Sequence, residues 1–266
     1  MEKNKIIKQI DIIRIKDAKK ILMKDSIIDE QVLKIYINNK KKIEMVFSNT
    51  DAKELVAGFL FTQGIVQDKE DISSIEFKKQ KKQCFIQLNN KAIKRLNKFI
   101  KGKKIKGSSG GILLQEKNLS PLKSNRTKLD DFLPIDYSKI LFLIKAHHDS
   151  SSLFHKTGAL HSAGICNKSK ILFYYQDIGR HNALDKMAGD ILLNNIDTSN
   201  KIATLSCRMS LEIIGKIIKM GIPIVISNAA PTLKAVKLAH KKGLTMIGFA
   251  KDNRFNIYTH EQKIAF

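Results

Sequence analysis

The sequence lacks tryptophan and has little cysteine, little arginine and no long apolar run. Cysteine occurs three times in 266 residues, at Cys84, Cys166 and Cys207, and never with CxxC spacing. Three thiols are too few for a disulfide scaffold, and their spacing excludes a zinc ribbon or finger. We therefore expect reduced thiols, no zinc and no other metal site.

No stretch of about 18 consecutive apolar residues occurs, so no transmembrane helix is expected. The first 20 residues mix charges with isoleucine and lack the apolar core of a signal peptide. We expect a cytoplasmic protein without a membrane partner. Apolar residues make up 43% of the chain, enough for a substantial core.

The chain carries 48 basic and 25 acidic residues, a net charge of +23 that would attract polyanions. Only six of the basic residues are arginine, and aromatic residues do not interleave the lysine runs. Proteins that read bases or bind single strands use arginine forks and aromatic stacking. The lysine bias is therefore better explained by an AT-rich genome, and a nucleic-acid partner is not expected.

The pattern predicts an α/β fold in two parts. Strand-like segments and two helices in the first half predict a small α+β domain over residues 1–134, in which residues 32–37 and 43–47 are strands joined by a hairpin turn at residues 38–40. Residues 102–134 are predicted to be a glycine-, serine- and lysine-rich loop, because they show no periodicity. Helices and strands alternate over residues 135–266, which predicts a mixed sheet with helices on both faces. Residues 244–250 are predicted as the last strand, and Pro231 as the first position of a helix.

Two junctions between a strand and a helix suggest chemistry. Arg180 and His181 follow Gly179 at the start of a predicted helix, where free amides and the helix dipole favour anions. Cys207 lies beside Arg208 ahead of another helix, surroundings that lower the pKa of a thiol. The alternatives are a capped turn for the first and a small buried residue for the second.

A third segment, residues 248–254, forms the exit from the last predicted strand and carries two cationic side chains and others that can hydrogen-bond. It suits phosphate or guanine binding, and the alternative is a surface loop. The histidines show no HxxxH or HExxH spacing, and no GxSxG motif is present, which argues against a metal site and a serine hydrolase.

Five motifs in order resemble one family over nearly the whole chain, the FdhD family of formate dehydrogenase accessory sulfurtransferases. The motifs are residues 156–161 (KTGALH), 177–186 (DIGRHNALDK), 207–212 (CRMSLE), 230–232 (APT) and 248–259. The resemblance implies a cytidine-deaminase-like C-terminal domain after a smaller α+β roll. The chain itself lacks the His-x-Glu and Pro-Cys-x-x-Cys signature of a zinc deaminase.

The resemblance also implies a function. Family members are expected to take sulfur from a cysteine desulfurase and pass it to the molybdenum of the bis-molybdopterin guanine dinucleotide cofactor for formate dehydrogenase, and to act as homodimers. The segment expected to hold the guanine dinucleotide matches Phe249, Ala250, Lys251, Asp252, Asn253 and Arg254.

The chain departs from the family at the active loop. The position of the persulfide cysteine falls on Ser109 or Gly110, and neither residue can form a sulfur–sulfur bond. Three hypotheses remain open. Cys207 substitutes as the sulfur-carrying thiol, or the chain is a non-catalytic chaperone that binds the cofactor, or its basic surface binds nucleic acid with a steep salt dependence.

Overall fold

The computed structural model describes residues 6–101 and 134–266. The Ser109 and Gly110 positions, and almost all of the predicted loop and domain boundary, lie outside these residues. Within the described residues, no helix is both long enough and apolar enough to span a membrane.

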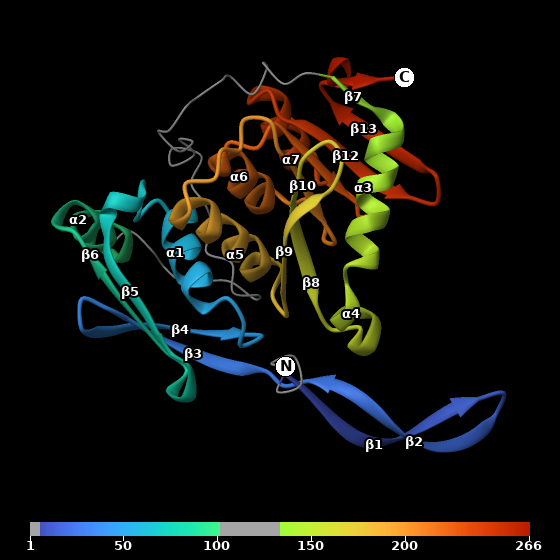
Figure 1. The fold of residues 1–266 in the computed structure, drawn as a ribbon, viewed down its shortest axis with the longest axis horizontal. Helices are drawn as coiled ribbons and strands as arrows, with labels where there is room; N and C mark the ends of the chain where they lie inside the picture. Colours follow the sequence, from blue (N-terminus) through green and yellow to red (C-terminus); the bar gives the residue numbers. More distant parts are fainter. Residues whose placement is uncertain (1–5, 102–133) are drawn as a thin grey trace.

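The chain begins with a two-stranded arm that projects from the body (Figure 1). Strand β1 (Ile7–Lys16) pairs with β2 (Lys19–Ile28) in an antiparallel hairpin that turns at Asp17 and Ala18, both with positive φ. Only its base packs on the body, where Ile6 and Ile28 contact Leu160. The sequence analysis missed these strands because isoleucine falls on both faces of the hairpin, which hides the alternation typical of a half-buried strand.

A four-stranded sheet follows, in the order β4-β3-β6-β5. Asn38 and Asn39 take the left-handed backbone conformation of a tight hairpin turn between the first two strands, as the sequence predicts. Buried and exposed residues alternate along β3 and β6, so one face packs on helices and the other meets solvent. The elements are β3 (Gln31–Ile37), β4 (Lys40–Phe47), α1 (Ala52–Thr62), β5 (Ile72–Lys78), β6 (Gln83–Leu88) and α2 (Asn90–Lys101).

The second half builds a six-stranded mixed sheet in the order β13-β12-β11-β10-β8-β9. Strands β10, β11 and β12 are parallel, and β8 and β13 flank them antiparallel. The strands are β8 (His161–Cys166), β9 (Ile171–Asp177), β10 (Ile202–Leu205), β11 (Ile224–Ser227), β12 (Thr245–Lys251) and β13 (Arg254–Thr259), and a short pair joins β7 (Ile135–Asp136) to β14 (Ile264–Ala265).

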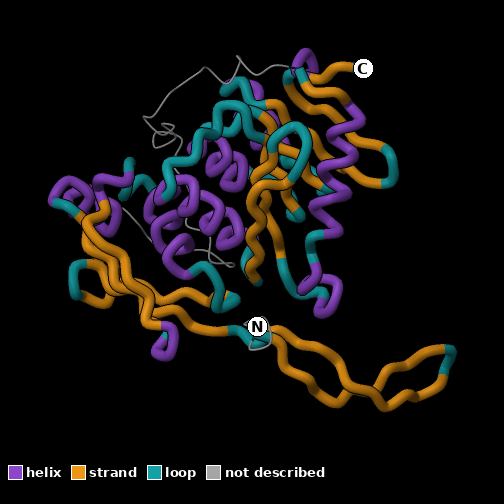
Figure 2. Tube along the Cα trace, in the orientation of Figure 1, coloured by secondary structure: helices purple, strands orange, loops and turns teal. Residues whose placement is uncertain are grey.

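Helices cover both faces of this sheet (Figures 1 and 2). On one face lies α3 (Tyr137–Asp149), and Ile140 and Leu143 pack there against isoleucines of β10, β11 and β12. On the other face, one hydrophobic core runs through both halves of the chain, from Leu33 and Leu55 to Leu205 and Ile213. The remaining helices are α4 (Ser152–Thr157), α5 (Arg180–Leu193), α6 (Leu211–Met220) and α7 (Leu233–Lys241).

Two details of the predicted second half are wrong. Two further strands, β13 and β14, follow the segment predicted as the last strand, because the tight turn at Asp252 and Asn253 returns the chain along β12. Pro231 precedes helix α7 rather than opening it. It forms a bridge with Met209, and Thr232 is the N-cap, whose hydroxyl accepts a hydrogen bond from Ala235 N.

Candidate ligand-binding cavity

A cavity of about 930 Å³ lies where the parallel strands end. Ser206 follows β10, Asn228 follows β11, and the turn after β12 supplies Asp252 and Asn253, and all four line the cavity. Ligands of open α/β sheets bind outside the carboxyl ends of the strands. The volume is within the range of about 300–1,000 Å³ found for sites that bind organic molecules.

The other walls come from α3, from α4 and the segment after it, and from the start of β8. Phe142 and Phe154 keep 51% and 40% of their surface exposed, so two aromatic rings are available for stacking at the rim. Lys145 and Lys251 add positive charge. The remaining lining residues are Leu141, Ile144, His147, His148, Ser151, Gly158, Ala159, Leu160, His161, Ser162 and Ala250.

Four of the eight predicted cofactor-binding residues line this cavity: Ala250, Lys251, Asp252 and Asn253. They lie in the β12–β13 hairpin, whose two-residue turn has positive φ at Asp252 and Asn253. Phe249 and Arg254 flank the turn but are not in the lining. The turn exposes a carboxylate and an amide, groups that hydrogen-bond well to the edge of a purine base.

The predicted anion site at Arg180 and His181 is built differently. His181 is 5% exposed, does not line the cavity, and places Nε2 3.4 Å from Oε2 of Glu212. The amide of Gly179, just before the helix, donates to Asp177 Oδ1 at 3.0 Å. Arg180 is half-buried. The burial of the cavity residue His161 lowers the pKa of its ring, and the positive charge of Arg180 lowers this pKa further. The role of both residues in binding a ligand stays a prediction.

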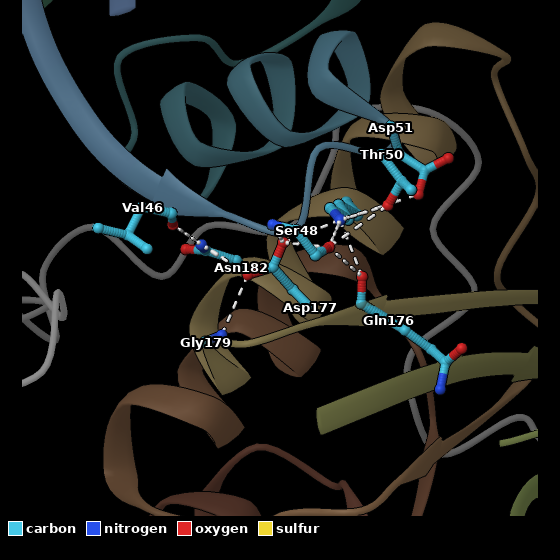
Figure 3. A network of polar contacts seen from close by, with 9 residues as sticks. Val46, Ser48, Thr50, Asp51, Gln176, Asp177, Gly179 and Asn182 are labelled. Carbon is cyan, nitrogen blue, oxygen red and sulfur yellow. Dashed lines mark hydrogen bonds and ion pairs between the residues drawn. The ribbon is translucent and has the colours of Figure 1, made fainter. Parts of the chain in front are cut away.

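The rest of the 177–186 motif joins the two halves of the chain (Figure 3). Lys186 is fully buried, and its Nζ lies 2.9 Å from Asp177 Oδ2. It also donates to the hydroxyls of Ser48 and Thr50, at 3.0 and 2.8 Å. Asn182 donates to Val46 O at 2.7 Å and to Asp177 Oδ1 at 2.9 Å. A motif that looked like a ligand site therefore binds the segment after β4 to the C-terminal sheet.

The expected lowering of the pKa of Cys207 is wrong. Cys207 is 3% exposed, and burial raises the pKa of its thiol to about 11, although the charges of Arg180 and Arg208 oppose the shift. Ser206 and Cys207 directly follow the end of β10, and they continue its alternation, in which successive residues point to opposite faces of the sheet. Ser206 lines the cavity, whereas Cys207 belongs to the core on the other face.

The other two thiols are also inaccessible. Cys84 and Cys166 have no exposed surface, and burial raises their pKa values to about 12 and about 11. All three cysteines of the chain lie in the described part of it, so none offers a surface thiolate in this conformation. No group of three or more histidine, cysteine, aspartate or glutamate side chains in residues 6–101 and 134–266 is arranged to hold a metal ion.

Two buried histidines should make the protein acid-sensitive. Burial lowers the pKa of His147 to about 4 and that of His181 to about 3, from about 6.5 in an unfolded chain. At pH 5 both rings stay neutral in the folded protein and become charged only on unfolding. The unfolded state then binds more protons, so stability falls as pH falls below about 6.5. We expect a loss of about 2 kcal/mol per histidine between pH 7.5 and pH 5.

Urea unfolding at the two pH values measures this loss. In His181→Gln the difference between the two pH values should shrink by about the share of one histidine, about 2 kcal/mol. The exposed His240 provides the control, because His240→Gln should leave the difference unchanged. An equal pH dependence in wild type and His181→Gln would contradict the prediction.

The sequence analysis missed several cavity residues. His147 and Ser151 lie one helical turn apart at the end of α3, whereas Ser162 and Ser206 come from two distant segments, and only the fold brings the three segments together. The signal that was available is position, since residues 202–206 and 222–227 are predicted strands, Ser206 ends the first and Asn228 directly follows the second.

Fold and cavity together define an α/β protein whose strand ends open into a site suited to a polar organic ligand. The chain belongs to the FdhD/NarQ family, whose model matches residues 28–265.

Relatives support the same assignment. The chain is 34% identical over 240 residues to a sulfur carrier protein FdhD of Bacillus pumilus, covering 90% of each chain, and 31% identical over 242 residues to that of Bacillus subtilis, covering 91% of each. A crystal structure of a proposed formate dehydrogenase accessory protein from Desulfotalea psychrophila superposes with a TM-score of 0.79. It is 23% identical, with 98% of this chain and 100% of that chain covered, so it shows the shared fold.

Proposed function

We propose that this protein is an accessory protein of formate dehydrogenase that binds the bis-molybdopterin guanine dinucleotide molybdenum cofactor, as substrate, in the cavity at the strand ends. The observation that carries the proposal is the placement of Lys251, Asp252 and Asn253 in the cavity wall. Lysine suits a phosphate, and the carboxylate and amide suit a guanine edge. Phe142 and Phe154 supply apolar surface for the rings of such a ligand.

Two versions of this role differ in their chemistry. In the first, the protein transfers sulfur from a cysteine desulfurase to the cofactor before its insertion into formate dehydrogenase. In the second, it holds and delivers the cofactor without carrying sulfur. The burial of all three thiols supports the second version. The position of Cys207, next to the cavity residue Ser206 and within the field of two arginines, supports Cys207 as the carrier in the first.

The proposal includes partners and a setting. We propose that the protein works in the cytoplasm as a homodimer, has a cysteine desulfurase as its partner for sulfur, and acts on the formate dehydrogenase apoprotein. The mixed sheet with helices on both faces supports the proposal of a cytidine-deaminase-like C-terminal unit.

Guanine nucleotide binding tests the cavity. We expect GDP to bind in calorimetry and Lys251→Glu to weaken it about tenfold, since one charge reversal near a phosphate costs about 1.4 kcal/mol. Lys91→Glu, on the exposed face of α2, is the matched charge control and should leave affinity unchanged. Equal affinities in Lys251→Glu and Lys91→Glu would move the site away from this cavity.

Intact-protein mass spectrometry separates the two versions. The protein is incubated with a cysteine desulfurase and cysteine, then measured with and without reductant. A cofactor carrier without sulfur transfer gains no mass, whereas a sulfur carrier gains about 32 Da that reductant removes. Loss of that gain in Cys207→Ala would identify the thiol, and its persistence would exclude Cys207.

A further inference from the structure

The face of the sheet under α3 is an isoleucine layer with one polar interruption. Ile140, Leu143, Ile226 and their neighbours form a buried apolar cluster there. The interruption is a set of five side chains, of which three line the cavity: His147, Ser151, Ser162, Tyr174 and Thr204. A buried polar network in an apolar layer is costly unless every member is paired, so its presence calls for a reason.

His147 is the centre of this network. Its ring leaves α3 toward the sheet, where Nδ1 lies 2.8 Å from Thr204 Oγ1 of β10 and Nε2 lies 2.8 Å from Ser162 Oγ of β8. The ring of Tyr174 packs against it edge-on, at 5.0 Å between centroids. Both nitrogens are therefore held by groups on two different strands, which leaves the ring one orientation.

Gly164 makes this arrangement possible. A Cβ at that position would lie 2.7 Å from Thr204 Oγ1 and 3.3 Å from His147 Nδ1. A larger residue on β8 would displace the hydroxyl that holds the ring. Because burial lowers the pKa of His147 to about 4, the ring is neutral near pH 7 and uses one nitrogen as donor and the other as acceptor.

The network reaches the cavity through Ser206. The amide of Ser162 donates to Ser206 Oγ at 2.8 Å, and the amide of Ser206 donates to Ser162 O at 3.1 Å. An oxygen that accepts such a bond keeps its own O–H as a donor. Within the described residues that hydroxyl has no acceptor, and Ser206 lines the cavity.

We propose that His147 is a positioning residue for ligand binding: it fixes residue Ser162 by its side-chain Oγ, and the main-chain amide of Ser162 in turn fixes Ser206 Oγ, so that the Ser206 O–H is left to donate to an acceptor atom of the ligand in the cavity. The inference rests on the proposed function for the existence of that ligand. It assigns His147 no contact with the ligand's reacting atoms.

A double-mutant cycle with GDP tests the coupling. Ser206→Ala should weaken GDP binding about tenfold, the effect of one lost hydrogen bond to a charged or strongly polar ligand. His147→Gln should weaken it by a similar factor. The double variant should be little worse than either single one, because both changes remove the same bond. Multiplying losses, or an unchanged affinity in Ser206→Ala, would overturn the proposal.

Two further measurements distinguish the positioning role of His147 from the proposed function. Ser150→Ala, an exposed serine at the end of α3, is the control for serine loss and should leave GDP affinity unchanged. Imidazole nitrogen NMR reads the positioning without any ligand. His147 should show one neutral tautomer from pH 7.5 to pH 5, and Ser162→Ala should change it.

The outcomes are distinguishable. Absence of GDP binding in the wild type would overturn the proposed function and the ligand contact of Ser206 together. A His147 ring that titrates near pH 6.5, or keeps its tautomer in Ser162→Ala, would overturn the positioning role even if GDP binds.

Discussion

Replacement of Lys186 by methionine should lower the free energy of unfolding by about 3–5 kcal/mol, the cost of removing one partner of a buried ion pair. Methionine keeps most of the volume of the side chain but leaves Asp177 with an uncompensated charge in a fully buried position. The substitution also removes the ammonium group that donates hydrogen bonds to Ser48 Oγ and Thr50 Oγ1. Denaturant unfolding at pH 7 measures the loss.

The double variant Asp177→Asn with Lys186→Met separates charge from packing. Because it removes both charges, it should recover part of the stability lost by Lys186→Met alone. Lys237→Met, on the exposed side of α7, is the matched control and should change stability by less than about 0.5 kcal/mol. A cost below about 1 kcal/mol for Lys186→Met would show that Lys186 does not hold the two halves together.

Alanine at Gly58 or Gly189 should destabilise the protein by about 3 kcal/mol or prevent folding, at the upper end of the effects of overpacking. The two glycines lie where α1 of the first half crosses α5 of the second. A Cβ on Gly58 would lie 1.8 Å from Asp185 O, and one on Gly189 would lie 1.8 Å from Glu54 O. Both obstacles are backbone atoms, so relief requires the helices to separate.

The sign of this effect is its most informative feature. In an exposed helix interior, glycine to alanine stabilises by about 0.5–1 kcal/mol because alanine loses less backbone freedom on folding. Circular dichroism and thermal unfolding of Gly58→Ala decide between the two signs. Lys53→Ala, on the exposed side of the same helix, should change stability by less than about 0.5 kcal/mol. A stabilised Gly58→Ala would mean that α1 and α5 are less closely packed than described.

Lys186 and the glycine crossing share a consequence for function. Both tie the first half of the chain to α5, the helix that starts at Arg180: Lys186 through its hydrogen bonds to Ser48 and Thr50, and the glycines through the close approach of α1 and α5. The 177–186 motif was interpreted from the sequence as an anion site. In the structure its residues Asp177, Asn182 and Lys186 hold the two halves of the chain together. The cavity lies on the opposite face of the sheet, under α3.

Local signals in the sequence account for what was predicted well. Turn chemistry and apolar periodicity over short spans predict the Asn38–Asn39 turn, the strands around it and a helix over residues 182–193, which the structure places at Arg180–Leu193. Residues 248–254 were predicted to bind a ligand because they leave a strand, and four of them, residues 250–253, line the cavity. Whether a residue lies at the end of a strand depends on its neighbours along the chain, so it can be predicted from the sequence.

Cys207 shows where local signals fail. Its neighbours Arg208 and the α6 N-terminus predict a lowered pKa. In the structure the thiol points into the core on the face of the sheet away from the cavity, and burial there raises its pKa. The i,i+4 spacing of Glu212 and Lys216 on helix α6 also predicts a local ion pair. Instead Glu212 lies against His181, and Lys216 binds Asp185 at 2.6 Å. The partners that decided both cases come from other elements of the fold.

The sequence by itself determined the α/β class, most of the helices and strands, the family resemblance and the segment that lines the cavity. Only the tertiary structure decided that the thiols are buried, that the 177–186 motif joins the two halves, and that His147, Ser162 and Ser206 meet beside the cavity. The reason is physical. Helices, strands and turns depend on residues a few positions apart, whereas burial, ion pairing and the pKa of a side chain depend on neighbours that folding brings from distant parts of the chain.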